Sequence, residues 1–197
     1  HHMKKLSDIV QFRGDRLFNG AVNIDWFWTD EERRREATNA FIFHGPAYHG
    51  VSQEDVGTSH EHQLQDTATF VHAIVRRCVG VEEQPFTLAI AGYGTGKSHL
   101  ALTLASLLKD PSSREAEGIL ARLSAADANI GAEIRALLHE HNTPSLIVAF
   151  NGMRRFDLVA AMTQQIFAQA QAHELDTRPL DELRPRFSQA ANLIRMS

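Results

Sequence analysis

The sequence contains a single cysteine, Cys78, among its 197 residues, so no disulfide can form within the chain. A lack of disulfides is typical of reducing compartments, and with no secretory signal at its start we expect the chain to be cytoplasmic. No apolar run approaches the ~18 residues that a membrane-spanning helix needs. Cys78 itself lies in a periodic apolar stretch, which favours a small buried side chain over a reactive thiol.

An excess of charge is also lacking, because 20 Lys and Arg residues face 24 Asp and Glu residues, for a net charge of −4. A slightly acidic chain repels phosphate as a whole, so a nucleic-acid-binding surface would have to be a local basic patch. Arg76-Arg77 and Arg154-Arg155 are the candidates, and solvated helix ends are the better interpretation of both.

Histidine is frequent, with 11 residues, but its spacing argues against a zinc site. Two of these histidines belong to His1-His2-Met3, which resembles the remnant of an affinity tag, and they are set aside as candidates for a metal site. In His60-Glu61-His62 and in His139-Glu140-His141 the paired rings would point about 200° apart on a helix. No cysteine lies near enough in the sequence to complete a ligand set. We therefore expect no histidine-bound metal.

Apolar residues recur at helical spacing in several segments. A charged helix over 31–36 is predicted to be capped by Thr29 or Asp30. Four further helices are predicted, over 64–78, over 112–123 with a capping box of Ser112 and Glu115, over 130–138 and over 156–167. Another helix follows the glycine-rich segment and ends before Pro111.

Short continuous apolar runs alternate with these helices. Phe86–Ile90 and Leu146–Phe150 have the length and composition of strands buried in a parallel sheet, and Ala40–Phe43 is a possible short strand. Strand, loop and helix recur after residue 85, which predicts an α/β fold. We expect a P-loop NTPase-type parallel sheet flanked by helices, incomplete within this chain. Residues 4–80 are expected to form a mixed amino-terminal segment, and residues 81–197 the first part of the NTPase domain.

The central motif is the segment Ala91–Ser98, which has the spacing of a Walker A P-loop with Ala in the first position. Its glycines, Gly92, Gly94 and Gly96, permit the tight turn and the close approach of backbone amides that a triphosphate requires. The helix that follows directs its free N–H groups at the anion. The alternative is a chance glycine-rich turn, but the strand-like run before it and the helix after it are the setting that the motif needs.

Each side chain of the motif receives a role on this interpretation. Lys97 is expected to reach the β- and γ-phosphates of ATP, and it is the candidate catalytic residue. Ser98 is expected to place its hydroxyl on Mg²⁺, which prefers oxygen ligands. Tyr93, Thr95 and His99 complete the set of candidate nucleotide-binding residues.

The acidic half of an ATPase site is missing. Hydrolysis requires an Asp or Glu at the end of a strand to hold Mg²⁺ or to activate water, and no apolar run in the sequence ends in one. Leu146–Phe150 is followed by Asn151-Gly152 instead. Asn151 could contact a phosphate or a magnesium-bound water, although a turn-forming Asn-Gly is the better interpretation. Either the domain continues beyond Ser197, which we favour, or the chain is a degenerate nucleotide binder.

The string from Gly92 to Leu100 resembles the Walker A segment of large bacterial anti-phage ATPases, the BREX ATPase group, which are related to AAA+ proteins. The resemblance covers roughly residues 81–170, and only its P-loop part is specific. It implies an amino-terminal fragment of a larger ATPase that binds ATP and Mg²⁺, acts with protein partners of a defence complex and contacts DNA only through that assembly. The string is also similar to helicase-loader and transposition ATPases of the DnaC/IstB type, in which an acidic strand follows sooner.

Three other functions stay open. A nucleotide-sensing module would bind ATP without hydrolysing it. A small-molecule kinase with a P-loop would need an arginine-rich lid, and none is visible after Leu108. A scaffold with a glycine loop would bind no nucleotide at all.

Overall fold

The computed structural model describes residues 18, 20–48, 66–83, 87, 94, 96–141, 144–151 and 157–183. Two compact units divide the chain, one of residues 1–144 and one of residues 145–197. The first unit carries the glycine-rich motif together with most of the helices.

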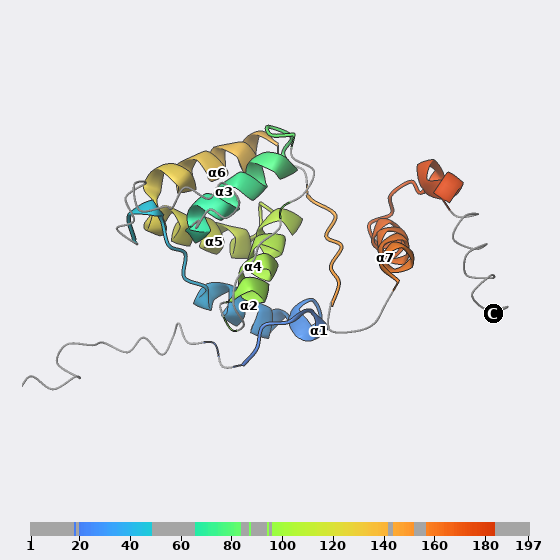
Figure 1. Ribbon diagram of the computed structural model, residues 1–197, viewed down its shortest axis with the longest axis horizontal. Coiled ribbons are helices and arrows are strands. Elements are labelled where there is room, and N and C mark those ends of the chain that lie inside the picture. The colour runs from blue at the N-terminus through green and yellow to red at the C-terminus, as the bar shows by residue number, and fades with distance from the viewer. Residues whose placement is uncertain are drawn as a thin grey trace, which may run out of the picture. The chain divides into compact units, whose positions relative to one another are not determined.

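Every regular element in the described ranges is a helix (Figure 1). The first unit contains α1 (Ile24–Phe27), α2 (Glu31–Ala40), the 3₁₀ helix η3 (Pro46–Tyr48), α3 (Thr67–Cys78), α4 (Lys97–Lys109), α5 (Arg114–Ala126) and α6 (Ala128–Glu140). The second unit contains α7 (Leu158–Ala172) and the 3₁₀ helix η4 (Arg178–Leu183). Of the helices described, none has both the length and the apolar character to cross a membrane.

The predicted parallel sheet is wrong for the part of the chain that the structure describes. Leu146–Phe150 is irregular rather than a strand, and α2 ends within Ala40–Phe43, with irregular backbone after it. Phe86–Ile90 lies outside the described residues except for Thr87. A run of five apolar residues cannot by itself be distinguished from other buried segments. A strand also needs a neighbour to pair its N–H and C=O groups, and no described segment supplies one.

The helix predictions from apolar periodicity are confirmed, and side-chain caps explain where the helices begin. Asp30 accepts a hydrogen bond from the backbone N–H of Arg33 at 3.0 Å, as predicted for the start of α2. Asp66 accepts one from Thr69 at 2.8 Å and starts α3. Such a cap satisfies an N–H group that has no partner within the helix. The caps of the remaining side-chain-capped helices, α1, α5, α6 and α7, are Asn23, Ser113, Asp127 and Asp157.

The core of the first unit forms where the apolar faces of α3, α4, α5 and α6 meet (Figure 1). α5 and α6 are joined by Asp127 alone, and α3 packs against α6 while α4 packs against α5. Burying one such aliphatic side chain contributes about 1.5–3 kcal/mol, so these faces dominate the stability of the unit. The largest fully buried apolar side chains here are Val71, Val75, Leu107, Ile119, Leu123 and Ile134.

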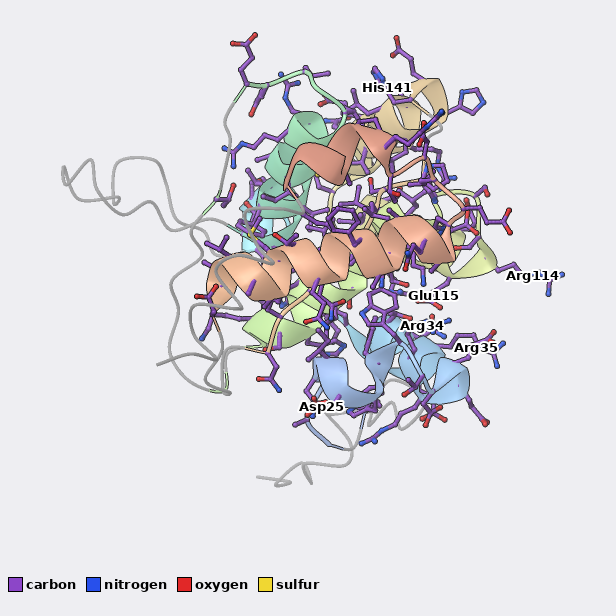
Figure 2. The ribbon with its side chains drawn as sticks, turned by 90° about the vertical axis from the view of Figure 1, so that its right-hand side faces the viewer. Asp25, Arg34, Arg35, Arg114, Glu115 and His141 are labelled. Carbon is purple, nitrogen blue, oxygen red and sulfur yellow. The ribbon has the colours of Figure 1, made fainter. Side chains whose placement is uncertain are left out.

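Polar contacts tie α2 to α4 and α5. The Nε atom of Arg34 lies 3.4 Å from Oε2 of Glu115 (Figure 2), and the hydroxyl of Ser106 donates to the other oxygen of Glu115. Arg122 donates to the carbonyl oxygen of Thr38 at 2.7 Å, in the last turn of α2. Glu115 therefore binds neighbouring helices, and the capping box predicted with Ser112 is wrong by one residue, because Ser113 caps α5.

The second unit is described by α7, η4 and the irregular stretch 145–151. Asp157 caps α7 by accepting from the N–H of Ala160 at 2.7 Å. The apolar pattern that predicted this helix is confirmed, but its first residues, Leu158 and Val159, remain more than half exposed. The carboxylate of Asp176 pairs with Arg178, which lowers the pKa of that exposed carboxyl group through hydrogen bonds from the guanidinium and the backbone.

Candidate functional site

Five of the predicted nucleotide-binding residues fall within the described ranges, at the start of α4. Gly92, Tyr93 and Thr95 lie outside them, so the path of the loop around a ligand is not described. Gly94 and Gly96 both adopt left-handed backbone conformations, with φ of +77° and +85°. Among the described residues, apart from the chain neighbours, no atom lies within 4 Å of a Cβ built on either residue, and the positive φ alone favours glycine there. The prediction that these glycines turn the chain with positive φ is confirmed.

The helix expected to open at the end of the motif is confirmed as well. α4 begins at Lys97, and the carbonyl oxygen of Gly96 accepts the first helical hydrogen bond from the N–H of Leu100 at 2.9 Å. Gly96 has no side chain, and α4 therefore starts without a side-chain cap, unlike the other α-helices in the described ranges. A helix start carries the positive end of the helix dipole, which favours an anion.

The start of α4 forms one wall of an open hollow of about 580 Å³. Gly94, Gly96, Lys97, Ser98 and His99 line it from the motif, and the side chains of Lys97 and Ser98 are exposed. A volume of this size lies within the range of small-molecule sites, roughly 300–1,000 Å³. The structure therefore brings the described part of the motif to the edge of a space that can hold a ligand.

The opposite wall comes from far upstream in the sequence. Phe18, Gly20, Ala21 and Val22, which precede α1, and Ala40, at the end of α2, complete the lining. No local sequence pattern links these residues to the motif, so their contribution to the hollow could not be predicted from the sequence. Their side chains are apolar, in contrast to the wall that α4 provides.

His99 joins the two walls. Its Nε2 atom lies 2.6 Å from the carbonyl oxygen of Ala37, and its ring packs edge-on against Phe41 with the ring centroids 5.0 Å apart. The carbonyl of Ala37 is in the last turn of α2, where helical partners are lacking. Burial lowers the pKa of His99, so the neutral ring with its proton on Nε2 suits this contact. This hydrogen bond therefore ties the start of α4 to α2, whose last residue, Ala40, lines the hollow.

Aromatic side chains support the upstream wall. The rings of Phe18 and Trp26 stack at 28° with centroids 5.5 Å apart, and the guanidinium of Arg33 lies 4.2 Å from the Trp26 centroid. Phe27 is fully buried and forms a core cluster with Ala37 and Leu102 of α4. Trp26 and Trp28, on either side of Phe27, are only partly buried against this cluster.

The charges at the hollow are basic rather than acidic. Among its lining residues in the described part of the chain, Lys97 is the one permanently charged side chain, and none is Asp or Glu. Ser98 supplies a side-chain hydroxyl. This arrangement would suit a phosphate at the helix terminus, and the Ser98 hydroxyl could supply an oxygen ligand to Mg²⁺. The described lining residues include no carboxylate that could activate water.

The other functional residues proposed from the sequence are not among the described lining residues of the hollow. Arg76 and Arg77 contact Glu82 near the end of α3, with Nε to carboxylate distances of 2.8 and 3.6 Å, and Arg154-Arg155 lies outside the described residues. Asn151 belongs to the second unit and follows irregular backbone, so the argument that placed it at the end of a strand is wrong.

Cys78 and the histidines can also be assessed. Cys78 is exposed rather than buried, because it is the last residue of α3, yet partial burial of its sulfur raises its pKa. No cluster of His, Cys, Asp and Glu among the described residues could hold a metal ion, and the pair His60 and His62 lies outside them.

Comparison with protein-family models, with curated proteins and with solved structures found no match to this chain.

Proposed function

We propose that the hollow at the start of α4 binds the phosphates of a nucleoside triphosphate, ATP with Mg²⁺. The observation that carries the proposal is the backbone from Gly94 to Lys97. Two left-handed glycines lead directly into a helix that has no side-chain cap and opens on a ligand-sized space. A glycine loop followed by a helix terminus is the arrangement that phosphate binding uses, and it acts through local backbone geometry.

In this proposal Lys97 and Ser98 have the roles that the Walker A motif predicts for them. Lys97, the first residue of α4, provides a point charge for the β- and γ-phosphates. Ser98 provides an oxygen ligand for Mg²⁺, whose other ligands are phosphate oxygens and water. The metal fits this donor set, because Mg²⁺ retains several waters and needs few protein ligands. ATP with Mg²⁺ is an intracellular ligand, and with a single cysteine in the chain we place the protein in the cytoplasm.

The role in a larger AAA+-related ATPase of the anti-phage type is proposed on the resemblance of residues 92–100 alone. This role predicts that ATP hydrolysis requires catalytic side chains from outside residues 96–141. Assays of ATPase activity on the longest natural chain test this role, and activity that survives Lys97→Ala would contradict it.

A second function, nucleotide sensing without hydrolysis, is favoured by one observation. The lining of the hollow, as far as the structure describes it, contains no carboxylate. A site of this kind would bind ATP and leave it intact. Binding of ATP without its hydrolysis by the longest natural chain, in the presence of Mg²⁺, would favour sensing over the ATPase role.

The experiment for phosphate binding compares two lysines of the same helix. Lys97 begins α4 beside the hollow, and Lys109 ends it, with its ammonium group 4.7 Å from the centroid of Trp28. Thermal unfolding is followed with and without ATP and Mg²⁺. At 100 times the dissociation constant the ligand adds about 2.7 kcal/mol to the stability of the wild type.

Lys97→Ala is expected to abolish most of this stabilisation at the same ligand concentration. Lys109→Ala removes an equal charge from the far end of α4 and is expected to retain it. A wild-type chain that is not stabilised by millimolar ATP, or variants that respond alike, would contradict the proposal.

A further inference from the structure

The two walls of the hollow differ in chemistry. The motif wall carries the helix terminus, Lys97 and Ser98, whereas the upstream wall is apolar and contains one aromatic ring, that of Phe18. A triphosphate alone would use only the first wall. The upstream wall suits a flat, uncharged group attached to the phosphates, and the base of a nucleotide is such a group.

The ring of Phe18 is held from several sides. Trp26 stacks on it at a centroid distance of 5.5 Å, the ring of His99 lies at 6.3 Å, and the guanidinium of Arg33 lies 5.7 Å from the Phe18 centroid. Phe18 is only partly buried against the core cluster of Phe27, Ala37 and Leu102, and it lines the hollow. An aromatic ring that its neighbours fix and that lines a hollow offers a stacking surface at little cost in side-chain entropy.

The residues beside Phe18 leave room for a base. Gly20, Ala21 and Ala40 have the smallest side chains, and Gly20 has a φ of +122° that other residues rarely adopt. A Cβ added to Gly20 would lie 3.1 Å from the guanidinium of Arg33. The chain therefore turns close to Arg33 at this point, and it presents small apolar groups to the hollow.

We infer that Phe18 is the stacking surface for the base of the bound nucleotide, and that the wall formed by Phe18, Gly20, Ala21, Val22 and Ala40 favours a purine. The inference rests on the proposed triphosphate site and adds the upstream wall as its base-recognition part. Stacking tolerates different bases because each has a π-face, and the larger purine ring covers more of the Phe18 ring than a pyrimidine does.

The test compares ATP with inorganic tripolyphosphate, which has the phosphates and no base. Dissociation constants are measured by calorimetry with Mg²⁺ for the wild type, Phe18→Leu and Phe18→Trp. Leucine retains the apolar packing against the core cluster and removes the ring, and tryptophan restores an aromatic surface. Circular dichroism establishes that each variant is folded.

We expect Phe18→Leu to weaken ATP binding by about 5- to 150-fold, the range that loss of one base-stacking contact produces. Tripolyphosphate binding is expected to be unchanged in Phe18→Leu, and ATP binding is expected to recover in Phe18→Trp. The wild type is also expected to bind ATP more tightly than CTP.

The outcomes separate this inference from the proposed function. If the wild type binds ATP no more tightly than tripolyphosphate, or Phe18→Leu weakens both alike, base stacking on Phe18 is refuted and the phosphate site stands. Equal affinity for CTP and ATP would refute the purine preference. If the wild type binds neither ATP nor tripolyphosphate, the proposed function itself fails.

Discussion

The substitution Gly131→Ala tests the packing of α6 on α5, on which the helical fold of the first unit depends. A Cβ added to Gly131 would lie 2.3 Å from the Oγ atom of Ser124, 2.5 Å from its Cα and 2.7 Å from its backbone nitrogen. A rotated side chain could relieve the first contact, but the other two involve backbone atoms. The two helices must therefore separate locally to admit one methyl group.

Two opposing effects determine how much Gly131→Ala changes the free energy of unfolding. Overpacking of this kind costs about 1–3 kcal/mol, and the backbone overlap places Gly131→Ala in the upper part of that range. Replacing a helical glycine by alanine offsets about 0.8–1.0 kcal/mol of the cost. The free energy of unfolding is expected to fall by about 1–2 kcal/mol.

Gly118 of α5 is the matched control. A Cβ on Gly118 would meet its nearest neighbour, Nη1 of Arg122, at 3.5 Å, an ordinary contact. Gly118→Ala is therefore expected to raise the free energy of unfolding by about 0.5–1 kcal/mol, since only the helix propensity changes. Urea unfolding followed by circular dichroism measures both variants. A Gly131→Ala variant as stable as Gly118→Ala would show that α6 does not pack closely on α5 at Ser124, which would contradict this helix packing.

Two further predictions concern His99 and Cys78. His99→Ala removes the contact to the carbonyl of Ala37 and should lower the free energy of unfolding in urea by about 1–3 kcal/mol, the cost of an unpaired buried carbonyl. His99→Phe keeps the ring and should lose a similar amount, so a fully stable His99→Phe would show that the hydrogen bond contributes little. Because its pKa is raised, Cys78 should be mostly thiol at pH 8 and should react with a disulfide reagent more slowly in the folded chain than in urea. Equal rates in the two states would refute this.

Local patterns predicted much of the fold. The apolar stripes of α3, α5 and α6 are amphipathic over several turns, and a side chain such as Asp30 marks a helix start because it can satisfy backbone N–H groups. The sheet was predicted from short apolar runs, whose meaning depends on whether a partner strand is present. Leu146–Phe150 is irregular because pairing of that kind is a tertiary property, which the run itself does not encode.

The difference between local patterns and tertiary contacts also applies to the candidate site. Glycine spacing predicted where α4 begins, since that depends on the local backbone, and the first residues of α4 line the hollow. The wall contributed by Phe18 and the hydrogen bond from His99 to Ala37 join segments that are distant in the sequence. Nothing in the composition of residues 18–40 indicates that they pack beside the motif, so only the folded chain reveals this half of the hollow.

The most direct test of the triphosphate site is the response of backbone amides to ATP. In ¹H–¹⁵N spectra of the chain titrated with ATP and Mg²⁺, we predict the largest shifts at the N–H groups of Gly96, Lys97, Ser98 and His99. They should be absent in Lys97→Ala at the same concentration. An unchanged spectrum in this region at millimolar ATP, or shifts confined to other helices, would contradict phosphate binding at the start of α4.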